Sequence, residues 1–318
     1  MDERMPYLFS QAAEDWLEYI RPGLKYSSLV RYTNILNVQL LPVFADSPVS
    51  EITRECVIRF RGQLLERGKD GKTGLAPNTV ALILSVLCRI LAFSYMEKRR
   101  PVSDLSKITI RQPAKPLRVF SMAEQRQLNQ YLKNATRDSD VGILLTFYTG
   151  LRIGEICALK WCDISFEDQS IHVHQTMQRI QTFQEKPRTK VIITSPKSSC
   201  SDRYIPIPDF LYQYLFLHRK NPNAFLLTGI PERYMEPRCL VVRFTHVLNE
   251  CGIQNATFHT LRHTFATRCI EQGVDTKTLS EILGHANVNI TLNRYVHPSM
   301  DFKRKNMDKL SGLFEDCL

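Results

Sequence analysis

Apolar residues recur at helical spacing through the first hundred residues of the chain. Trp16, Leu17 and Ile20, for example, fall on one side of a helix over residues 9–20. Further helices are expected from the Ser27-Ser28 pair to residue 40, where Pro42 would stop the helix, then over 51–65, and over 78–97 with Asn78 as its cap. Four helices in about 95 residues predict a small helical bundle.

The pattern changes after residue 106. Residues 107–117 hold two prolines, three basic residues and little apolar weight, which is typical of an extended linker. We therefore expect a helical domain over 1–106, a linker over 107–117 and a second domain over 118–318.

The second domain has a mixed pattern. Ser121 and Glu124 form a capping box that opens a helix, a buried helix is expected over 141–148, and another after Gly150. Residues 171–174 alternate as a strand does, and 191–194 and 203–207 continue the alternation, with a polar loop between the last two. Residues 177–190 are expected to be a long connecting loop, and helices resume at Asp209, Pro237, Thr260 and Thr276. The predicted fold class is mainly α with a small antiparallel β-sheet: a helical bundle followed by a mixed α+β domain.

Composition agrees with a two-domain globular protein. The chain has 318 residues, of which 43% are hydrophobic and 23% charged, and a net charge of +10. No window reaches the roughly 18 uninterrupted apolar residues of a membrane helix, since the richest one, 80–96, is broken by Ser85, Arg89 and Ser94. The N-terminus shows no secretory signal. The excess of base favours a polyanionic partner, either nucleic acid or, with less support, an anionic membrane surface.

The cysteines are scattered and give no metal or redox motif. No C-x-x-C occurs, which argues against a zinc ribbon or a thioredoxin motif. We expect reduced thiols and a cytoplasmic location. The nine positions are Cys56, Cys88, Cys157, Cys162, Cys200, Cys239, Cys251, Cys269 and Cys317.

Four segments of the second domain hold residue types suited to phosphate binding and nucleophilic chemistry. They read TGLRIGEICALKW, PKSSCSDRYIPIP, HTLRHTFAT and LGHANVNITLNRY. Each has an ordinary alternative: a surface arginine, a solvated lysine, a histidine at a helix end, a core tyrosine. His259 and His263, four residues apart, could suggest a zinc pair, but Thr260 stands where a metalloprotease has glutamate.

Taken together, in this order, the four segments resemble the tyrosine recombinase (phage integrase) family over roughly residues 117–297. The resemblance implies a SAM-like core-binding domain for the N-terminal bundle and a catalytic domain of the DNA breaking-rejoining type. It implies an enzyme that cuts and rejoins DNA through a 3′-phosphotyrosyl intermediate and a Holliday junction, without ATP, metal or any cofactor.

The resemblance also implies a role for each motif residue. Arg152 and Arg262 would stabilise charge on the phosphate, and Tyr295 would be the nucleophile. The remaining residues implied are Lys197 as general acid, His259 as proton acceptor or phosphate donor, His285 as a phosphate hydrogen-bond donor and Glu155 as the residue that orients the arginine. We interpret His263 as structural.

The partner implied is double-stranded DNA with inverted-repeat core sites, gripped by both domains as a clamp. Candidate DNA contacts in the bundle are Lys25, Arg31 and Lys72. The resemblance implies a homotetramer on DNA and a monomer or weak oligomer when free of DNA. A helix over 302–314 would dock on the next protomer, or alternatively pack on its own domain. Accessory DNA-bending or directionality proteins would belong to such a system.

We interpret the chain as a simple integrase of a mobile element, without an arm-binding domain. The alternatives within the family are a chromosome-dimer resolvase or a DNA invertase. A type IB topoisomerase is disfavoured by the segment after Tyr295, and an inactive DNA-binding regulator by the complete set of catalytic residue types.

Overall fold

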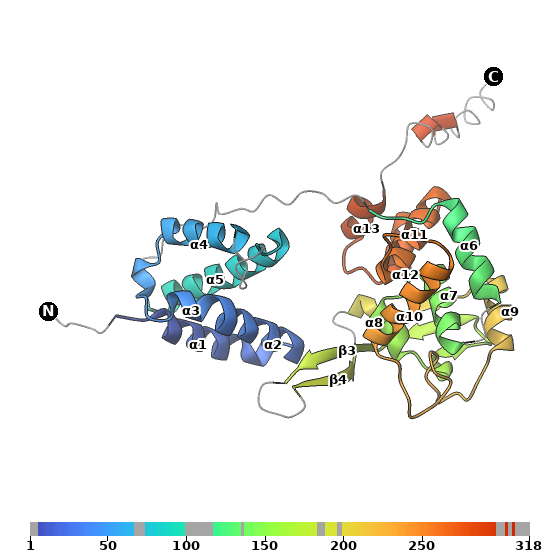
Figure 1. The fold of residues 1–318 in the computed structure, drawn as a ribbon, viewed down its shortest axis with the longest axis horizontal. Coiled ribbons are helices and arrows are strands. Elements are labelled where there is room, and N and C mark those ends of the chain that lie inside the picture. The colour runs from blue at the N-terminus through green and yellow to red at the C-terminus, as the bar shows by residue number, and fades with distance from the viewer. Residues whose placement is uncertain are drawn as a thin grey trace, which may run out of the picture. The chain divides into compact units, whose positions relative to one another are not determined.

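The computed structural model describes residues 6–66, 74–98, 117–134, 137–182, 188–195, 199–296, 303–304 and 307–308. It is mainly helical with two small sheets (Figure 1). The chain divides into two compact units. The N-terminal unit holds Met1–Lys115 and Ile180–Arg188, and the C-terminal unit holds Pro116–Arg179 and Thr189–Leu318.

The N-terminal unit is a helical bundle around one long apolar helix. Its helices are α1 (Phe9–Ile20), α2 (Tyr26–Ile35), α3 (Leu41–Phe44), α4 (Arg54–Glu66) and α5 (Pro77–Lys98). The apolar faces predicted from the sequence meet in one cluster, in which Phe9, Leu40, Leu87, Ile90 and Leu91 are fully buried. The predicted bundle is therefore present.

The second predicted helix differs from its prediction at both ends. The Ser27-Ser28 pair lies inside α2, whose cap is Lys25, and Pro42 lies in the first turn of α3 instead of ending a helix. A π turn, Leu36–Leu40, stands between α2 and α3, and the Leu41 N–H bonds the Leu36 carbonyl there. Proline lacks an N–H and its ring crowds the carbonyl four residues earlier, so the wider turn accommodates it without ending the helical path.

One described helix is long and apolar enough to cross a membrane: residues Pro77–Met96 of α5 have a mean hydropathy of 2.0. Val80, Ile83 and Leu87 of this helix are buried in the bundle core. Packing in the bundle core explains why α5 is so apolar, because a helix surrounded by other helices is apolar on most sides.

The C-terminal unit is built around the buried helix α7 (Asp138–Thr149). The predicted capping box opens α6, where the Ser121 hydroxyl accepts from the Glu124 N–H and the Glu124 carboxylate accepts from the Ser121 N–H. The other helices are α6 (Met122–Lys133), α8 (Ile153–Ala158), α9 (Asp209–Leu217), α10 (Pro237–Glu250), α11 (Phe258–Glu271), α12 (Thr276–Leu283) and α13 (Val288–Tyr295).

The strands form two sheets instead of one. β1 (Ile164–Ser165), β2 (Ser170–Val173) and β5 (Arg203–Pro206) form an antiparallel sheet with β2 in the centre, while β3 (Thr176–Gln181) pairs only with β4 (Thr189–Thr194). The expected loop over 177–190 is therefore wrong in part, since β3 occupies its start and β4 begins at Thr189. The buried residues of β3, Met177 and Ile180, are three apart and break the two-residue period of a strand, which hid β3 in the sequence.

Several sequence predictions fall outside the described residues. These are most of the linker, the side chains of Lys72 and Lys197, and most of the helix expected over 302–314, of which only residues 303–304 and 307–308 are described, as helical. The eight described cysteines are free thiols, and Cys157 is the buried one among them.

Candidate active site

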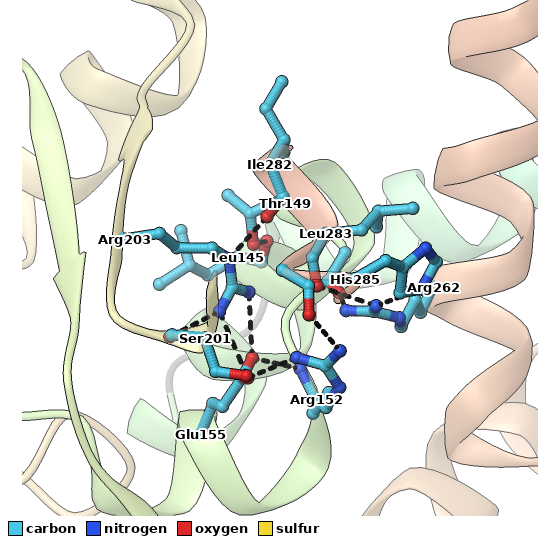
Figure 2. Close-up of polar contacts among 12 residues, drawn as sticks. Leu145, Thr149, Arg152, Glu155, Ser201, Arg203, Arg262, Ile282, Leu283 and His285 are labelled. Carbon is cyan, nitrogen blue, oxygen red and sulfur yellow. Dashed lines mark hydrogen bonds and ion pairs between the residues drawn. The ribbon is translucent and has the colours of Figure 1, made fainter. Parts of the chain in front are cut away.

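Three arginines from different parts of the C-terminal unit bind the last carbonyls of α12 (Figure 2). Arg203 Nε donates to the Ile282 oxygen at 2.6 Å, Arg262 Nη2 to the Leu283 oxygen at 2.8 Å, and Arg152 Nη2 to the Gly284 oxygen at 2.7 Å. The final carbonyls of a helix lack intrahelical partners and carry partial negative charge. This helix end therefore gathers three guanidinium groups without a carboxylate for each.

Gly284 makes the close approach of Arg203 to this helix end achievable. It ends α12 in the left-handed conformation with φ +64°, where a side chain is strained. A Cβ on Gly284 would also lie 3.0–3.1 Å from three atoms of the Arg203 guanidinium.

A second left-handed glycine places Arg152. Gly150, with φ +66°, ends α7, and the chain then turns so that Arg152 caps α8. A Cβ at Gly150 would meet Phe265 at 2.7 Å and Leu283 at 2.8 Å. The TGLR motif thus combines a tight turn against α11 and α12 with an arginine directed at the site.

Glu155 lies between two of the arginines. It is 4% exposed, accepts from Arg152 Nη1 at 2.8 Å, and pairs with both terminal nitrogens of Arg203 at 3.2 and 3.0 Å. Burial alone would raise the pKa of this carboxyl, but the hydrogen bonds and charge of Arg203, with the charge of Arg152, hold it below the usual range. Glu155 is therefore an anion that fixes both arginines.

Arg262 is the most enclosed of the three arginines, with 2% of its surface exposed. Besides the α12 carbonyl, it donates to the Gly150 oxygen at 2.7 Å and to His285 Nε2 at 2.9 Å. Burial and the charge of Arg152 lower the pKa of Arg262 to about 9, which leaves it charged at neutral pH. His285 bonds Thr291 Oγ1 at 2.8 Å through its other ring nitrogen.

Tyr295 ends α13 inside this cationic cluster. It is 6% exposed, its ring is parallel to that of His285 with centroids 6.5 Å apart, and its hydroxyl lies 2.9 Å from His263 Nδ1. Burial raises the pKa of Tyr295 more than the charges of Arg262, Arg294 and Arg152 lower it. The hydroxyl is thus protonated at neutral pH and directed into a site rich in positive charge.

The histidines of the site are neutral. Desolvation and the charge of Arg262 lower the pKa of His285 to about 4, and desolvation with neighbouring His259 lowers that of His263 to about 3. The rings of His259 and His263 are nearly perpendicular, with centroids 4.4 Å apart, and the pKa of His259 is lowered as well, by desolvation and by the charge of Arg262. Neutral imidazoles can both donate and accept a proton.

The structure brings together most of the residues singled out in the sequence. Arg152, Glu155, Arg262, His285 and Tyr295 share one network, and His259 joins it through its contact with His263. Lys197 lies outside the described residues, between β4 and the 3₁₀ turn Ser199–Ser201.

No role was predicted for Arg203, the arginine that reaches both Glu155 and α12. A signal was present: Arg203 occupies an inward position of an alternating strand, the same face as Ile205, where an apolar residue is usual. An arginine at such a position needs a buried acceptor, and Glu155 is that acceptor.

No group of three or more histidine, cysteine or acidic residues that could hold a metal ion occurs within the described part of the chain.

Two family models match the chain in agreement with this fold and site. The phage integrase family matches residues 118–301, and the phage integrase N-terminal SAM-like domain matches residues 8–65. The fold and the arginine, histidine and tyrosine cluster define an enzyme class that breaks and rejoins DNA through a tyrosine. The chain belongs to the phage integrase family, that of the tyrosine recombinases.

The curated relatives include a tyrosine recombinase and a transposon transposase. A tyrosine recombinase XerC-like protein of Caldanaerobacter subterraneus subsp. tengcongensis is 30% identical over 330 aligned positions, which cover 94% of this chain and 81% of the relative. The transposase of transposon Tn916 from Enterococcus faecalis is 29% identical over 198 positions, which cover 53% of this chain and 44% of the transposase.

Solved structures share the fold. The Tn1549 transposon integrase in complex with a circular intermediate DNA matches with a TM-score of 0.76 and 20% identity, over 95% of this chain and 99% of that one. A lambda integrase tetramer bound to a Holliday junction matches with a TM-score of 0.63 and 17% identity, over 93% of this chain and 80% of the other.

Proposed function

We propose that this recombinase cuts DNA by attack of the Tyr295 oxygen on a backbone phosphate, and rejoins it by the reverse reaction on a new strand. The observation that carries the proposal is the convergence of Tyr295, Arg262 and His285 in one buried network. The tyrosyl oxygen forms a bond to phosphorus while the bond to the 5′ oxygen breaks. The product, a 3′-phosphotyrosyl bond, keeps the energy of the phosphodiester, so no ATP is needed.

Arg152 and Arg262 stabilise the charge that builds on the phosphate oxygens during attack. Their positions are held before DNA arrives, by the α12 carbonyls and Glu155, so little reorganisation accompanies the reaction. Loss of one such donor lowers rates by about 10²–10³ in acyl-transfer enzymes, which gives the scale for either arginine here. His285 adds a hydrogen bond to the phosphate from Nε2, once Arg262 turns to the phosphate, the ring proton moves to Nε2 and Nδ1 accepts from the Thr291 hydroxyl.

Two proton transfers complete the step. The phenolic proton of Tyr295 passes to neutral His259, and the leaving 5′ oxygen takes a proton from Lys197. The reverse pair of transfers accompanies rejoining, when the 5′ hydroxyl of the new strand attacks the phosphotyrosyl bond and frees the tyrosine.

The N-terminal unit is proposed to be the core-DNA-binding domain, and residues 118–318 the catalytic domain with its tail. The SAM-like match and the exposed positions of Lys25 and Arg31 support this assignment, and Lys72 is a third candidate contact. The DNA is a pair of inverted-repeat core sites, on which four copies assemble and exchange strands through a Holliday junction, helped by accessory DNA-bending or directionality proteins. The lambda integrase tetramer supports this arrangement through its fold.

The biological role proposed is that of a mobile-element integrase acting on DNA in the cytoplasm. The Tn916 relative and the Tn1549 integrase fold support it. The XerC-like relative, which aligns with nearly the whole chain, supports resolution of chromosome dimers as the second candidate. Inverted repeats at the ends of an excisable segment beside the coding sequence would favour the role of mobile-element integrase.

The test is covalent capture on a nicked suicide duplex that carries those repeats. The wild-type protein should form an adduct that survives denaturation, and Tyr295→Phe should form none while binding the duplex with unchanged affinity. Tyr19→Phe, in an exposed tyrosine of the N-terminal unit, is the matched control and should form adduct normally. An adduct formed by Tyr295→Phe would refute the nucleophile, and supercoil relaxation without pairing of sites would favour a topoisomerase.

A further inference from the structure

The hydroxyl of Tyr295 has one direct side-chain contact that the mechanism above does not use. His263 Nδ1 lies 2.9 Å from it, and both residues are almost fully buried, with 7% and 6% of their surfaces exposed. His263 belongs to α11 and follows Arg262 directly, whereas Tyr295 ends α13. The contact therefore ties the nucleophile to the helix that carries one of the catalytic arginines.

The direction of this hydrogen bond follows from the other side of the His263 ring. Arg294 Nη2 lies 3.4 Å from His263 Nε2, and a guanidinium can only donate. The imidazole is neutral at neutral pH, so one ring nitrogen carries its single proton. Because Nε2 accepts from Arg294, the proton is on Nδ1 and is donated to the tyrosine oxygen.

His285 shows the same arrangement. Its Nε2 accepts from Arg262 at 2.9 Å, so its Nδ1 carries the proton and donates to the Thr291 hydroxyl at 2.8 Å. In both cases an arginine fixes the tautomer and the histidine holds a hydroxyl oxygen of α13. At His263 that oxygen is the nucleophile itself.

We propose that His263 holds the nucleophile of this recombinase, by donating a hydrogen bond from Nδ1 to the oxygen of Tyr295 in the free enzyme and as the phenolate forms. The proposal rests on the function proposed above, in which Tyr295 attacks the phosphate. It replaces the interpretation of His263 as a structural residue.

This bond has the direction that attack requires. Because His263 donates, the tyrosine's own proton is not engaged with it and can leave to another acceptor while the bond persists. A hydrogen bond to a developing negative charge is stronger than one to a neutral oxygen. The charged and titratable groups around His263 are His259 and Arg262 on its own helix, and Arg294 and Tyr295 on α13.

The test compares two substitutions of His263 in the full-length protein. His263→Ala removes the donor, whereas His263→Asn keeps one, because the asparagine Nδ2 lies at the same number of bonds from Cβ as the histidine Nδ1 and cannot take up a proton. Single-turnover adduct formation on the suicide duplex should fall about 10–100-fold in His263→Ala, the range for a hydrogen bond to a charged group. The rate of adduct formation by His263→Asn should stay within about fivefold of wild type, a smaller loss than that range.

A pH profile separates this role from a merely structural one. Loss of the donor makes the phenolate harder to form, so the rising limb of the rate should move to higher pH in His263→Ala and remain in place in His263→Asn. His246→Asn, in an exposed histidine of α10, is the matched control and should behave as wild type. Unchanged adduct formation by His263→Ala overturns the proposal. So does an asparagine variant that is folded and as slow as the alanine variant, since it indicates that the ring accepts a proton.

A measurement on the free protein keeps this inference distinct from the proposed function. Two-bond ¹H–¹⁵N correlation spectra of protein labelled at histidine report the tautomer of each ring, and the His263 signals are those lost in His263→Asn. The Nδ1–H tautomer of His263 is expected. A change of the His263 signals in Tyr295→Phe would report the hydrogen bond between His263 Nδ1 and the Tyr295 hydroxyl. The Nε2–H tautomer overturns the proposal, whatever the outcome of the adduct assay. Absence of wild-type adduct beside the expected tautomer would instead refute the proposed function.

Discussion

The two units of this protein bury different kinds of side chain. Among the described residues, the buried polar side chains of the N-terminal unit are Ser94 and Thr182, and its core is otherwise apolar. The C-terminal unit buries charged groups as well as an apolar core, including Glu155, Arg203 and Arg262. The core of the first unit is thus mainly buried apolar surface, while the second unit also keeps charge away from water.

Within the C-terminal unit, two buried charge clusters differ in their balance. Asp140 of α7 pairs with Arg243 of α10, with two hydrogen bonds between them, one cation for one anion. Glu155 alone faces Arg152 and Arg203, and Arg262 lies beyond, with carbonyls, a neutral histidine and the Tyr295 hydroxyl as its partners. A buried charge needs compensation, so the balanced pair is complete, and the second cluster has an excess of positive charge suited to an anion such as phosphate.

The largest effect on stability is expected from Glu155→Gln, which leaves the buried Arg203 and the partly exposed Arg152 without their anion. Removal of one partner of a buried ion pair lowers the free energy of unfolding by about 3–5 kcal/mol. Trp161 is buried in the C-terminal unit and Trp16 in the N-terminal unit, so the fluorescence of each single-tryptophan protein reports one unit. The loss should appear in denaturant unfolding followed at Trp161.

The same substitution on the surface is the control. Glu281→Gln removes the carboxylate of an exposed pair with Lys277 and should change the stability by less than about 1 kcal/mol. Asp140→Asn should destabilise the same unit as Glu155→Gln does but leave adduct formation by the folded protein unchanged. An equal loss of adduct in both variants would contradict the distinction between the two clusters.

In the N-terminal unit the corresponding loss should come from an apolar residue. Leu87 of α5 is fully buried, and Leu87→Ala should lower the free energy of unfolding followed at Trp16 by about 2–5 kcal/mol. Leu65→Ala, at a leucine of α4 that is 37% exposed, is the control in the same unit and should cost less than Leu87→Ala. A Leu87→Ala protein as stable as wild type would show that the bundle does not depend on this core.

Acid should destabilise the C-terminal unit first, because all eight histidines of the sequence lie in it. The pKa of His263 is about 3 in the folded protein, and unfolding returns it to about 6.5. The unfolded chain therefore binds the proton more readily below pH 6.5, and His263 alone should remove about 2 kcal/mol of stability by pH 5. The lowered pKa of Glu155 adds a further loss in the same direction as pH falls below about 4.5.

The measurement is the unfolding midpoint at Trp161 and at Trp16 between pH 7 and pH 5. The midpoint at Trp161 should fall while that at Trp16 stays nearly constant, and His263→Asn should reduce the fall. Parallel changes at both tryptophans would contradict the assignment of acid sensitivity to the histidines.

The smallest effect is expected at the capping box of α6. Ser121→Ala removes the acceptor for the Glu124 N–H and should cost about 1 kcal/mol at Trp161. Ser121→Asp keeps an acceptor at the cap, and this variant should have the stability of the wild-type protein. Equal stability of the serine and alanine proteins would show that the cap contributes nothing in this context.

Sequence patterns predicted most elements but not all of their limits or pairings. The helical periods of α1 and α5 and the capping box of α6 are local signals, and the structure confirms those elements. The strand β3 was missed and the partner of β4 was misassigned, because strand pairing depends on distant residues. The ends of the second helix were wrong, because a π turn lets the helical path continue past Pro42.

The candidate site likewise contains residues that the sequence could predict and residues whose roles it could not. The motif residues Arg152, Arg262, His285 and Tyr295 could be selected from their order along the chain. The roles of Arg203 and His263 could not, because a buried arginine and a tautomer are defined by what they contact: Glu155 and the α12 carbonyls for one, Arg294 and Tyr295 for the other.

The amino-acid sequence by itself determined the helical bundle, the mixed second unit and the set of residue types available for phosphate chemistry, since periodicity, caps and motif order are properties of neighbouring residues. Only the tertiary structure decided that three arginines converge on the end of α12 and that a neutral histidine contacts the tyrosine hydroxyl. The physical reason is that hydrogen-bond direction and the charge of a buried group depend on the partners that folding brings from distant parts of the chain.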